Sequence, residues 1–273
     1  MIAFPNCKIN LGLNVLSKRP DGFHNINTVF YPINWCDILE VVEKQSDKPL
    51  TLSVTGKEIQ GKTEDNLLYK TWKIISGLKK LPPLHIHLHK VIPMGAGIGG
   101  GSSDAAFLVR LLDKKFSLEL SYEEKHGIAS QLGSDCAFFL SKNPLYAIGR
   151  GNDFTPVTVD LSKYYILVVF PSVHSSTKEA FDGLTPKKPM HDLKHIIETA
   201  PLSEWKNLVI NDFDVTVMKK YPAIKELKDQ LYKAGAVYSS MSGSGSSVYA
   251  IFNKKPELIF PSNYDFYLQL PTS

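Results

Sequence analysis

The chain has 273 residues, of which 43% are hydrophobic and 21% are charged, a balance typical of globular proteins that excludes disorder, collagen or coiled coil for the chain as a whole. No apolar run reaches the roughly 18 residues that span a bilayer, the N-terminus does not resemble a signal peptide, and three scattered cysteines predict neither a disulfide framework nor a zinc site. The net charge of +4 is too small for a dedicated nucleic-acid binder and suits an enzyme of anionic substrates, so we expect a cytoplasmic protein that binds neither nucleic acid nor membrane.

The first part of the chain predicts mainly strands. Apolar residues alternate from Ile9 to Val15, with Lys8 and Asn10 on the opposite face, which indicates a half-buried strand. Asn66 is placed to cap a helix that turns Leu68, Trp72 and Ile75 toward the core. Further strands are expected at residues 28–33, 38–43, 50–54 and 84–89.

The rest of the chain alternates between helices and strands. Ser121 to Glu124 forms a capping box, and Pro222 and Gly235 bracket a later helix. Other helices are expected at residues 103–112, near 134–135, at 190–198 and at 212–221, and strands at 164–170, 236–241, 248–252 and 264–270. Strands come in clusters without regular βαβ repetition, so the predicted class is α+β, with lobes at residues 1–155 and 156–273.

A glycine-rich loop at residues 93–103, Pro-Met-Gly-Ala-Gly-Ile-Gly-Gly-Gly-Ser-Ser, stands between a predicted strand and a helix. Its backbone N–H groups and the helix N-terminus predict an anion cradle suited to a polyphosphate. A dinucleotide-binding unit would need a second strand and an acidic residue about 20 residues later, where a capped helix is expected instead. A Walker A loop would need Lys in place of Gly101, and protein-kinase signatures do not occur. A flexible linker is disfavoured by the ordered elements on both sides.

Residues 93–106 resemble the phosphate loop of the GHMP kinases, the superfamily of galactokinase and of homoserine, mevalonate and phosphomevalonate kinases. Three further segments resemble motifs of this superfamily in the same order: residues 8–15 with 19–24, residues 132–139, and residues 241–248. Phe23 stands where Tyr is usual, Cys7 where Ala is usual, and Cys136-Ala137 where Val-Pro is usual. The resemblance implies a GHMP kinase fold, with an N-terminal lobe like domain 2 of ribosomal protein S5 and a ferredoxin-like C-terminal lobe.

The resemblance also implies the activity and the site. It implies an ATP-dependent small-molecule kinase that uses Mg²⁺ and phosphorylates a hydroxyl of a cytidine diphosphate-linked methylerythritol. The implied catalytic residues are Lys8 and Asp135, with Asp135 as the base and the two charged groups within about 4 Å. The implied substrate-binding residues are Asn10, Phe23, His24, Asp135, Gly243 and Ser244. The implied ATP-binding residues are Asn66, Lys90, Pro93, Met94, Gly95, Ala96, Gly97, Ile98, Gly99, Gly100, Gly101, Ser102 and Ser103, and Ser103 is also the implied ligand of the metal.

Three alternative functions are weighed against this one. Another GHMP kinase, acting on mevalonate, phosphomevalonate or homoserine, has the same chemistry with a different acceptor. A degenerate kinase fold acting as a ligand-binding regulator is disfavoured because Lys8, the glycine loop and Asp135 are all present. A dinucleotide-dependent dehydrogenase lacks its second strand.

The histidines at positions 85, 87 and 89 share one face of a predicted strand. Three histidines on one face can suggest a metal site, but such a site needs neighbouring ligands and partners that orient them. No Asp, Glu or Cys is close in the sequence, so we expect a polar outer face of a sheet.

Overall fold

The computed structural model describes residues 1–272, which form two compact units. Unit 1 comprises residues 1–7, 34–94 and 99–142, and unit 2 comprises residues 8–33, 95–98 and 143 onward. Both units are discontinuous in the sequence, whereas the predicted lobe boundary at residue 155 divides the chain once and stays a prediction. Throughout the described residues, every helix is too short or too polar to span a membrane.

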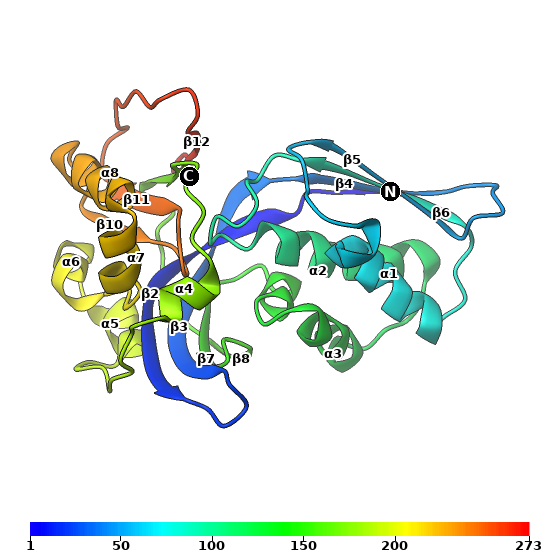
Figure 1. Cartoon of the computed structure of the whole chain (residues 1–273), viewed down its shortest axis with the longest axis horizontal. Helices are drawn as coiled ribbons and strands as arrows, with labels where there is room; N and C mark the ends of the chain where they lie inside the picture. Colours follow the sequence, from blue (N-terminus) through cyan, green and yellow to red (C-terminus); the bar gives the residue numbers. More distant parts are fainter. Residues whose placement is uncertain (273) are drawn as a thin grey trace. The chain divides into compact units, whose positions relative to one another are not determined.

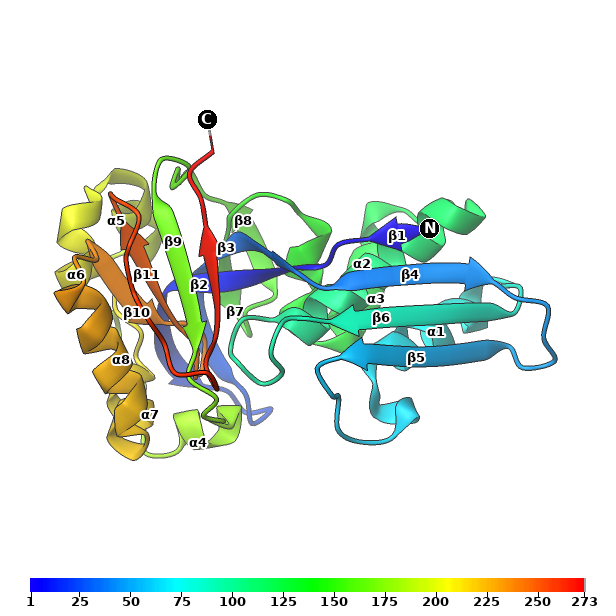
Figure 2. The same cartoon turned by 90° about the horizontal axis from the view of Figure 1, so that it is seen from above.

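Unit 1 is a four-stranded sheet covered by helices on one face (Figures 1 and 2). The sheet has the strand order β1-β4-β6-β5, and only the β5–β6 pair is parallel. A parallel neighbour needs a crossover connection, which the helix α1 supplies between β5 and β6. The elements are β1 (Ile2–Ala3), β4 (Ile38–Glu43), β5 (Leu50–Gly56), α1 (Leu67–Leu78), β6 (Leu84–Lys90), α2 (Gly100–Phe116) and α3 (Tyr122–Leu132), with short 3-10 helices at Thr63–Asp65 and Cys136–Leu140.

Local sequence signals determine where the helices of unit 1 begin. Asn66 caps α1 by accepting a hydrogen bond from the Leu68 N–H at 2.9 Å, and Ser121 and Glu124 form both bonds of a capping box at α3. Apolar residues of the sheet and of α1, α2 and α3 then form one core. This core leaves the other face of the sheet uncovered.

That uncovered face carries the three histidines. Leu84, Ile86 and Leu88 point into the core, so the intervening histidines point away from it. The Ser53 hydroxyl lies 2.7 Å from His85 Nε2. The Thr55 hydroxyl lies 2.9 Å from His87 Nε2 and 3.0 Å from His89 Nδ1. Within residues 1–272, no three His, Cys, Asp or Glu side chains form a cluster that could hold a metal.

We expect the triple substitution of His85, His87 and His89 by Gln to leave both phosphoryl-transfer activity and metal content nearly unchanged. The glutamine amide can replace the ring nitrogens as a partner for the neighbouring hydroxyls. Metal analysis of the purified protein, beside an activity assay, checks this. A stoichiometric transition metal that is lost in the variant would contradict it.

Unit 2 contains two antiparallel sheets. The first has the order β2-β3-β7-β8 and the second the order β10-β11-β9-β12. The strands are β2 (Asn6–Lys18), β3 (His24–Cys36), β7 (Leu145–Gly149), β8 (Asp153–Pro156), β9 (Tyr165–Phe170), β10 (Tyr238–Met241), β11 (Val248–Phe252) and β12 (Asp265–Gln269). The helices are α4 (Thr177–Phe181), α5 (Leu193–Thr199), α6 (Trp205–Leu208), α7 (Asp214–Lys220) and α8 (Pro222–Lys233), with a 3-10 helix at Leu202–Glu204.

The core of unit 2 joins the two sheets. Leu13 and Val15 of β2 share one buried cluster with residues of β9, β10, β11, α7 and α8. Figure 1 shows α7 and α8 beside the strands β10 and β11. Pro222 lies at the first turn of α8 and Gly235 has a φ of +91°, as the sequence predicts.

The structure corrects several predicted elements. The strand from Ile9 to Val15 is buried on both faces instead of one, because its polar side chains are bonded to loops of unit 2. The helix predicted at 103–112 begins earlier, at Gly100, and the helix predicted at 190–198 begins later, after Asp192 has capped it. The helix predicted at 212–221 is the shorter α7, and the strands β7 and β8 were not predicted.

Candidate active site

Strand β2 holds Lys8 and Asn10 side by side inside unit 2. Residues two apart in a strand share a face, and both side chains are only 2% exposed. The Lys8 ammonium donates to Asn10 Oδ1 at 2.6 Å and to the Gly97 carbonyl at 3.1 Å. It also lies 4.9 Å from the centre of the Phe30 ring. A cation removed from water against an aromatic ring acts strongly on nearby charges, here at the glycine-rich loop.

Asn10 is held in turn by its neighbours. Its Nδ2 donates to the Thr28 hydroxyl at 2.9 Å, which leaves Oδ1 facing Lys8. The Ser242 hydroxyl also approaches Oδ1, at 3.3 Å. Thr28 was not predicted as a site residue, because a lone Thr in a strand carries no functional signal.

The glycine-rich loop adopts a backbone that requires glycine. Gly95, Gly97 and Gly99 have φ values of +64°, +75° and +73°, a region that disfavours residues with a Cβ. Helix α2 follows directly, and Gly99 before it offers no side chain to cap the helix. The first N–H groups of a helix have no partner within the helix and carry a partial positive charge. The role of this loop as an anion cradle stays a prediction.

The Ser/Gly loop (residues 242–247) packs against residues 95–98 within unit 2. A Cβ on Gly97 would lie 2.3 Å from the Ser242 carbonyl oxygen and 2.7 Å from that of Gly245. The Ser242 hydroxyl donates to the Gly97 carbonyl at 3.0 Å, and the Ser247 N–H donates to the Ala96 carbonyl at 3.0 Å. The structure therefore brings together Lys8, Asn10, residues 95–98 and the Ser/Gly loop, although 145 residues separate Gly97 from Ser242.

Helix α4 connects the Ser/Gly loop to His24. The Thr177 hydroxyl lies 3.1 Å from the Ser244 hydroxyl, and the Phe181 ring stacks on the His24 ring with centroids 4.2 Å apart and planes 11° apart. Partial burial, aided by the charge of Lys18, lowers the pKa of His24, which favours the neutral form of the ring. Phe181 was missed by the sequence analysis because α4 is a five-residue helix without a recognisable motif.

Phe23 is packed against a cation. The Arg150 guanidinium lies 3.5 Å from the centre of the Phe23 ring, which is 48% exposed. The pairing brings the β2–β3 loop to the β7–β8 turn. The sequence analysis did not identify Arg150, since its partner lies more than 100 residues away.

Asp135 belongs to unit 1 and stands directly before the 3-10 helix Cys136–Leu140. The thiol that follows it is inert, because burial raises the pKa of Cys136 to about 11. Lys8 belongs to unit 2, and the expected approach of its ammonium to the Asp135 carboxylate stays a prediction.

Lys90, predicted to bind ATP, is part of a fully buried ion cluster with Asp37 and Asp104 in unit 1. Its ammonium donates to Asp37 Oδ2 and, at 2.8 Å, to Asp104 Oδ2. Asp37 Oδ1 accepts the N–H groups of Val91 and Ile92 at 2.6 and 2.8 Å. A Cβ on Gly100 would lie 3.0 Å from Lys90 Nζ. The ion cluster therefore packs directly against the first residue of α2. The Lys90 ammonium is fully buried, so it cannot contact a nucleotide directly.

The second carboxylate of this cluster predicts a pH dependence. Burial raises the pKa of Asp104 to about 8, although Lys90 opposes the shift. In the unfolded chain the pKa of an Asp is about 3.9, so the folded protein retains a proton that the unfolded chain releases. Asp104 therefore makes the free energy of unfolding fall as the pH rises from about 4 to about 8.

We expect Asp104→Asn to gain stability relative to the wild type across that pH window. The neutral amide cannot titrate, so the pH-dependent loss is absent. Urea denaturation of both proteins at several pH values checks this, with the exposed Asp229→Asn as a control that has no such trend. A constant difference between Asp104→Asn and the wild type would contradict it.

Comparisons with known proteins agree with this geometry. The family models described as GHMP kinases N terminal domain and GHMP kinases C terminal match residues 66–143 and 198–259. A protein of Cytophaga hutchinsonii is 51% identical over 94% of each chain, and one of Bacteroides thetaiotaomicron is 48% identical over 96% of this chain and 94% of its own. Both are named 4-diphosphocytidyl-2-C-methyl-D-erythritol kinase.

Solved structures agree as well. A structure of 4-(cytidine 5'-diphospho)-2C-methyl-D-erythritol kinase is 27% identical, with a TM-score of 0.75 and coverage of 92% of this chain and 90% of that one. Methanococcus jannaschii mevalonate kinase, 13% identical, shares the fold with a TM-score of 0.70 over 98% and 97% of the two chains. The fold expected from the glycine-rich loop is thereby confirmed.

Proposed function

We propose, since this chain belongs to the 4-diphosphocytidyl-2-C-methyl-D-erythritol kinase family, that it transfers the γ-phosphoryl group of ATP to the 2-hydroxyl of 4-diphosphocytidyl-2-C-methyl-D-erythritol. The observation that carries the proposal is the contact of the Lys8 ammonium with Asn10 and with the Gly97 carbonyl of the glycine-rich loop. This contact joins a buried cation to a phosphate-binding backbone. Both substrates are small water-soluble anions, and we propose the cytoplasm as the compartment.

Phosphoryl transfer depends on positioning and on neutralising charge. In the proposed mechanism the N–H groups at residues 95–103 hold the triphosphate, and α2 adds the positive end of its dipole. Lys8 stabilises the charge on the transferring group. Asp135 accepts the proton of the acceptor hydroxyl as the oxygen attacks phosphorus, and ADP leaves.

The proposed acceptor site combines the Ser/Gly loop with β2 and β3. Asn10 and the backbone of Gly243 and Ser244 would bind the polyol and diphosphate. In its neutral form, which the lowered pKa favours, His24 can donate one hydrogen bond and accept another, which suits the edge of a cytosine. Phe23 supplies an aromatic surface but no hydroxyl, unlike the Tyr usual in the family.

The side chains at the start of α2 are compatible with a Mg²⁺ ion that binds together with ATP. Among residues 1–272 no carboxylate cluster forms a separate metal site. The Ser103 hydroxyl, however, is buried at the start of α2 with no hydrogen-bond partner, and a hydroxyl oxygen suits a hard cation. When bound, Mg²⁺ neutralises phosphate charge, and we propose Ser103 as its protein ligand. Asn66 and the backbone near Lys90 would bind the rest of the nucleotide.

A coupled assay of ADP release tests the proposal against the alternatives. The acceptors are 4-diphosphocytidyl-2-C-methyl-D-erythritol, mevalonate and homoserine, beside a reaction without acceptor. We expect turnover with the first alone, with one ADP formed per acceptor phosphorylated. Faster turnover with mevalonate or homoserine would assign another substrate of the superfamily. Nucleotide binding without transfer to any acceptor would indicate a regulator.

A further inference from the structure

We propose that Asn211 is a positioning residue that holds the Ser/Gly loop in register with the strand carrying Lys8 and Asn10. The proposal deepens the proposed function and rests on it for the role of the loop. Nothing in the sequence singles out Asn211, which lies in the connection between α6 and α7.

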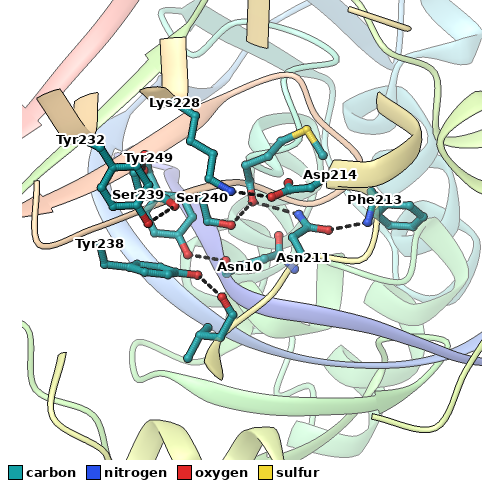
Figure 3. Close-up of polar contacts among 12 residues, drawn as sticks. Asn10, Asn211, Phe213, Asp214, Lys228, Tyr232, Tyr238, Ser239, Ser240 and Tyr249 are labelled. Carbon is teal, nitrogen blue, oxygen red and sulfur yellow. Dashed lines mark hydrogen bonds and ion pairs between the residues drawn. The ribbon is translucent and has the colours of Figure 1, made fainter. Parts of the chain in front are cut away.

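Both N–H donors and the carbonyl oxygen of the Asn211 side chain are hydrogen-bonded. Its Nδ2 donates to the Met241 carbonyl at 2.9 Å and its Oδ1 accepts the Phe213 N–H at 3.0 Å (Figure 3). The same Nδ2 also donates to the Gly243 carbonyl at 2.9 Å. The residue is 1% exposed. Because one nitrogen carries two donors, Asn211 bonds the chain both at Met241, the last residue of β10, and at Gly243 in the Ser/Gly loop. An aspartate of the same size would lose both donors and place a carboxylate against two carbonyl oxygens.

The backbone around Asn211 is attached to β2. The Leu13 N–H donates to the Ile210 carbonyl at 2.9 Å, and the Asp212 N–H donates to the Leu13 carbonyl at 2.8 Å. Asp212 Oδ2 also accepts the Val15 N–H at 2.8 Å. Residues 210–212 therefore act as a short parallel bridge to β2, three residues beyond Asn10. Asn211 therefore pairs with β2 through the backbone and bonds the Ser/Gly loop through its side chain.

The Ser/Gly loop is bonded in turn to the glycine-rich loop. Ser242, one residue from each carbonyl that Asn211 holds, bonds Gly97 through its hydroxyl. A second hydrogen bond fixes the position of β11 relative to β2, since the Tyr249 hydroxyl donates to the Asn10 carbonyl at 2.8 Å (Figure 3). Without Asn211 the loop keeps its hydrophobic neighbours but loses two of the bonds that set its distance from Asn10.

The structure offers a matched control. The Tyr238 hydroxyl donates to the Val209 carbonyl at 2.9 Å, in the same part of unit 2 and with similar burial. Neither atom of this bond belongs to the Ser/Gly loop or to β2, although Val209 packs on Gly12 of β2 and the Tyr238 ring contacts Tyr249. Tyr238→Phe therefore removes a buried hydrogen bond from the same part of the unit and leaves the bonds of Asn211 to the Met241 and Gly243 carbonyls in place.

The test compares Asn211→Asp, Asn211→Ser and Tyr238→Phe with the wild type. Because the Ser/Gly loop is proposed to bind the acceptor, displacing it weakens acceptor binding, and we expect the KM for the acceptor to rise at least tenfold in the Asn211 variants. The KM for ATP should change less than threefold, because β2 still holds the glycine-rich loop through Lys8. If Asn211→Asp does not fold, the same KM values are measured for Asn211→Ser, whose smaller side chain keeps one donor.

Hydrogen exchange supplies a readout that needs no acceptor. We expect the N–H groups of residues 242–247 to exchange at least tenfold faster in Asn211→Ser and at the wild-type rate in Tyr238→Phe. Equal exchange in the wild type and Asn211→Ser, or an equal rise of the acceptor KM in Tyr238→Phe, would overturn the positioning role. Inactivity of the wild type toward the proposed acceptor would instead refute the proposed function, and the exchange experiment would still decide the role of Asn211.

Discussion

We expect Asp135→Asn to lower kcat by about 10²–10⁴-fold, the usual contribution of a general base. The substitution keeps the side-chain volume and one acceptor oxygen but removes the negative charge and nearly all basicity. Affinity for ATP should hardly change, because the backbone of residues 95–103 holds the triphosphate. It should rise slightly if it changes, since a carboxylate near the γ-phosphate repels it. Coupled assays for kcat and calorimetry for ATP binding measure the two effects separately.

Lys8 supplies a further check on this prediction. Lys8→Ala should also lower kcat, and the double variant should lose less than the product of the two single losses, because residues that act as a unit are not additive. If Asp135→Asn retains more than about half of the wild-type kcat, the carboxylate is not the base. In that case a loose transition state needs no proton acceptor at this position.

The second large effect concerns stability. We expect Lys90→Met to lower the free energy of unfolding by about 3–5 kcal/mol, the usual cost of removing one partner from a buried ion pair. Methionine fills nearly the same space, so the loss reports the charge and not a cavity. The variant leaves the buried carboxylate of Asp37, with Asp104 beside it, without the cation that both side chains contact. Urea denaturation followed by circular dichroism measures the difference.

A surface pair provides the comparison for Lys90. Lys225 and Asp229 lie 2.7 Å apart on α8 and are largely exposed, so Lys225→Ala should lower the free energy of unfolding far less than Lys90→Met does. A loss in Lys90→Met as small as that of Lys225→Ala would show that the buried cluster adds nothing to stability. It would then have no part in supporting the start of α2.

Local signals in the sequence are enough to predict several elements of this chain. Asn66 caps α1 and Ser121 caps α3 because each side chain bonds an N–H two or three residues away. The glycines at 95, 97 and 99 are recognisable for the same reason, since a positive φ is a property of single residues. The resemblance of the glycine-rich loop and of three further segments to motifs of the GHMP kinases predicted the family and the fold, which the comparisons confirm.

Tertiary structure alone decides which distant residues meet. The alternation of β2 predicts an exposed polar face, yet Lys8 and Asn10 are buried because loops 89 and 232 residues further along the chain bond to them. The same limit applies to Lys90, whose ammonium is occupied by Asp37 and Asp104. It applies equally to Asn211, Phe181 and Arg150, which carry no local pattern. Hydrogen bonds and stacking act over a few ångströms in space, so residues far apart in the sequence gain these partners only when the chain has folded.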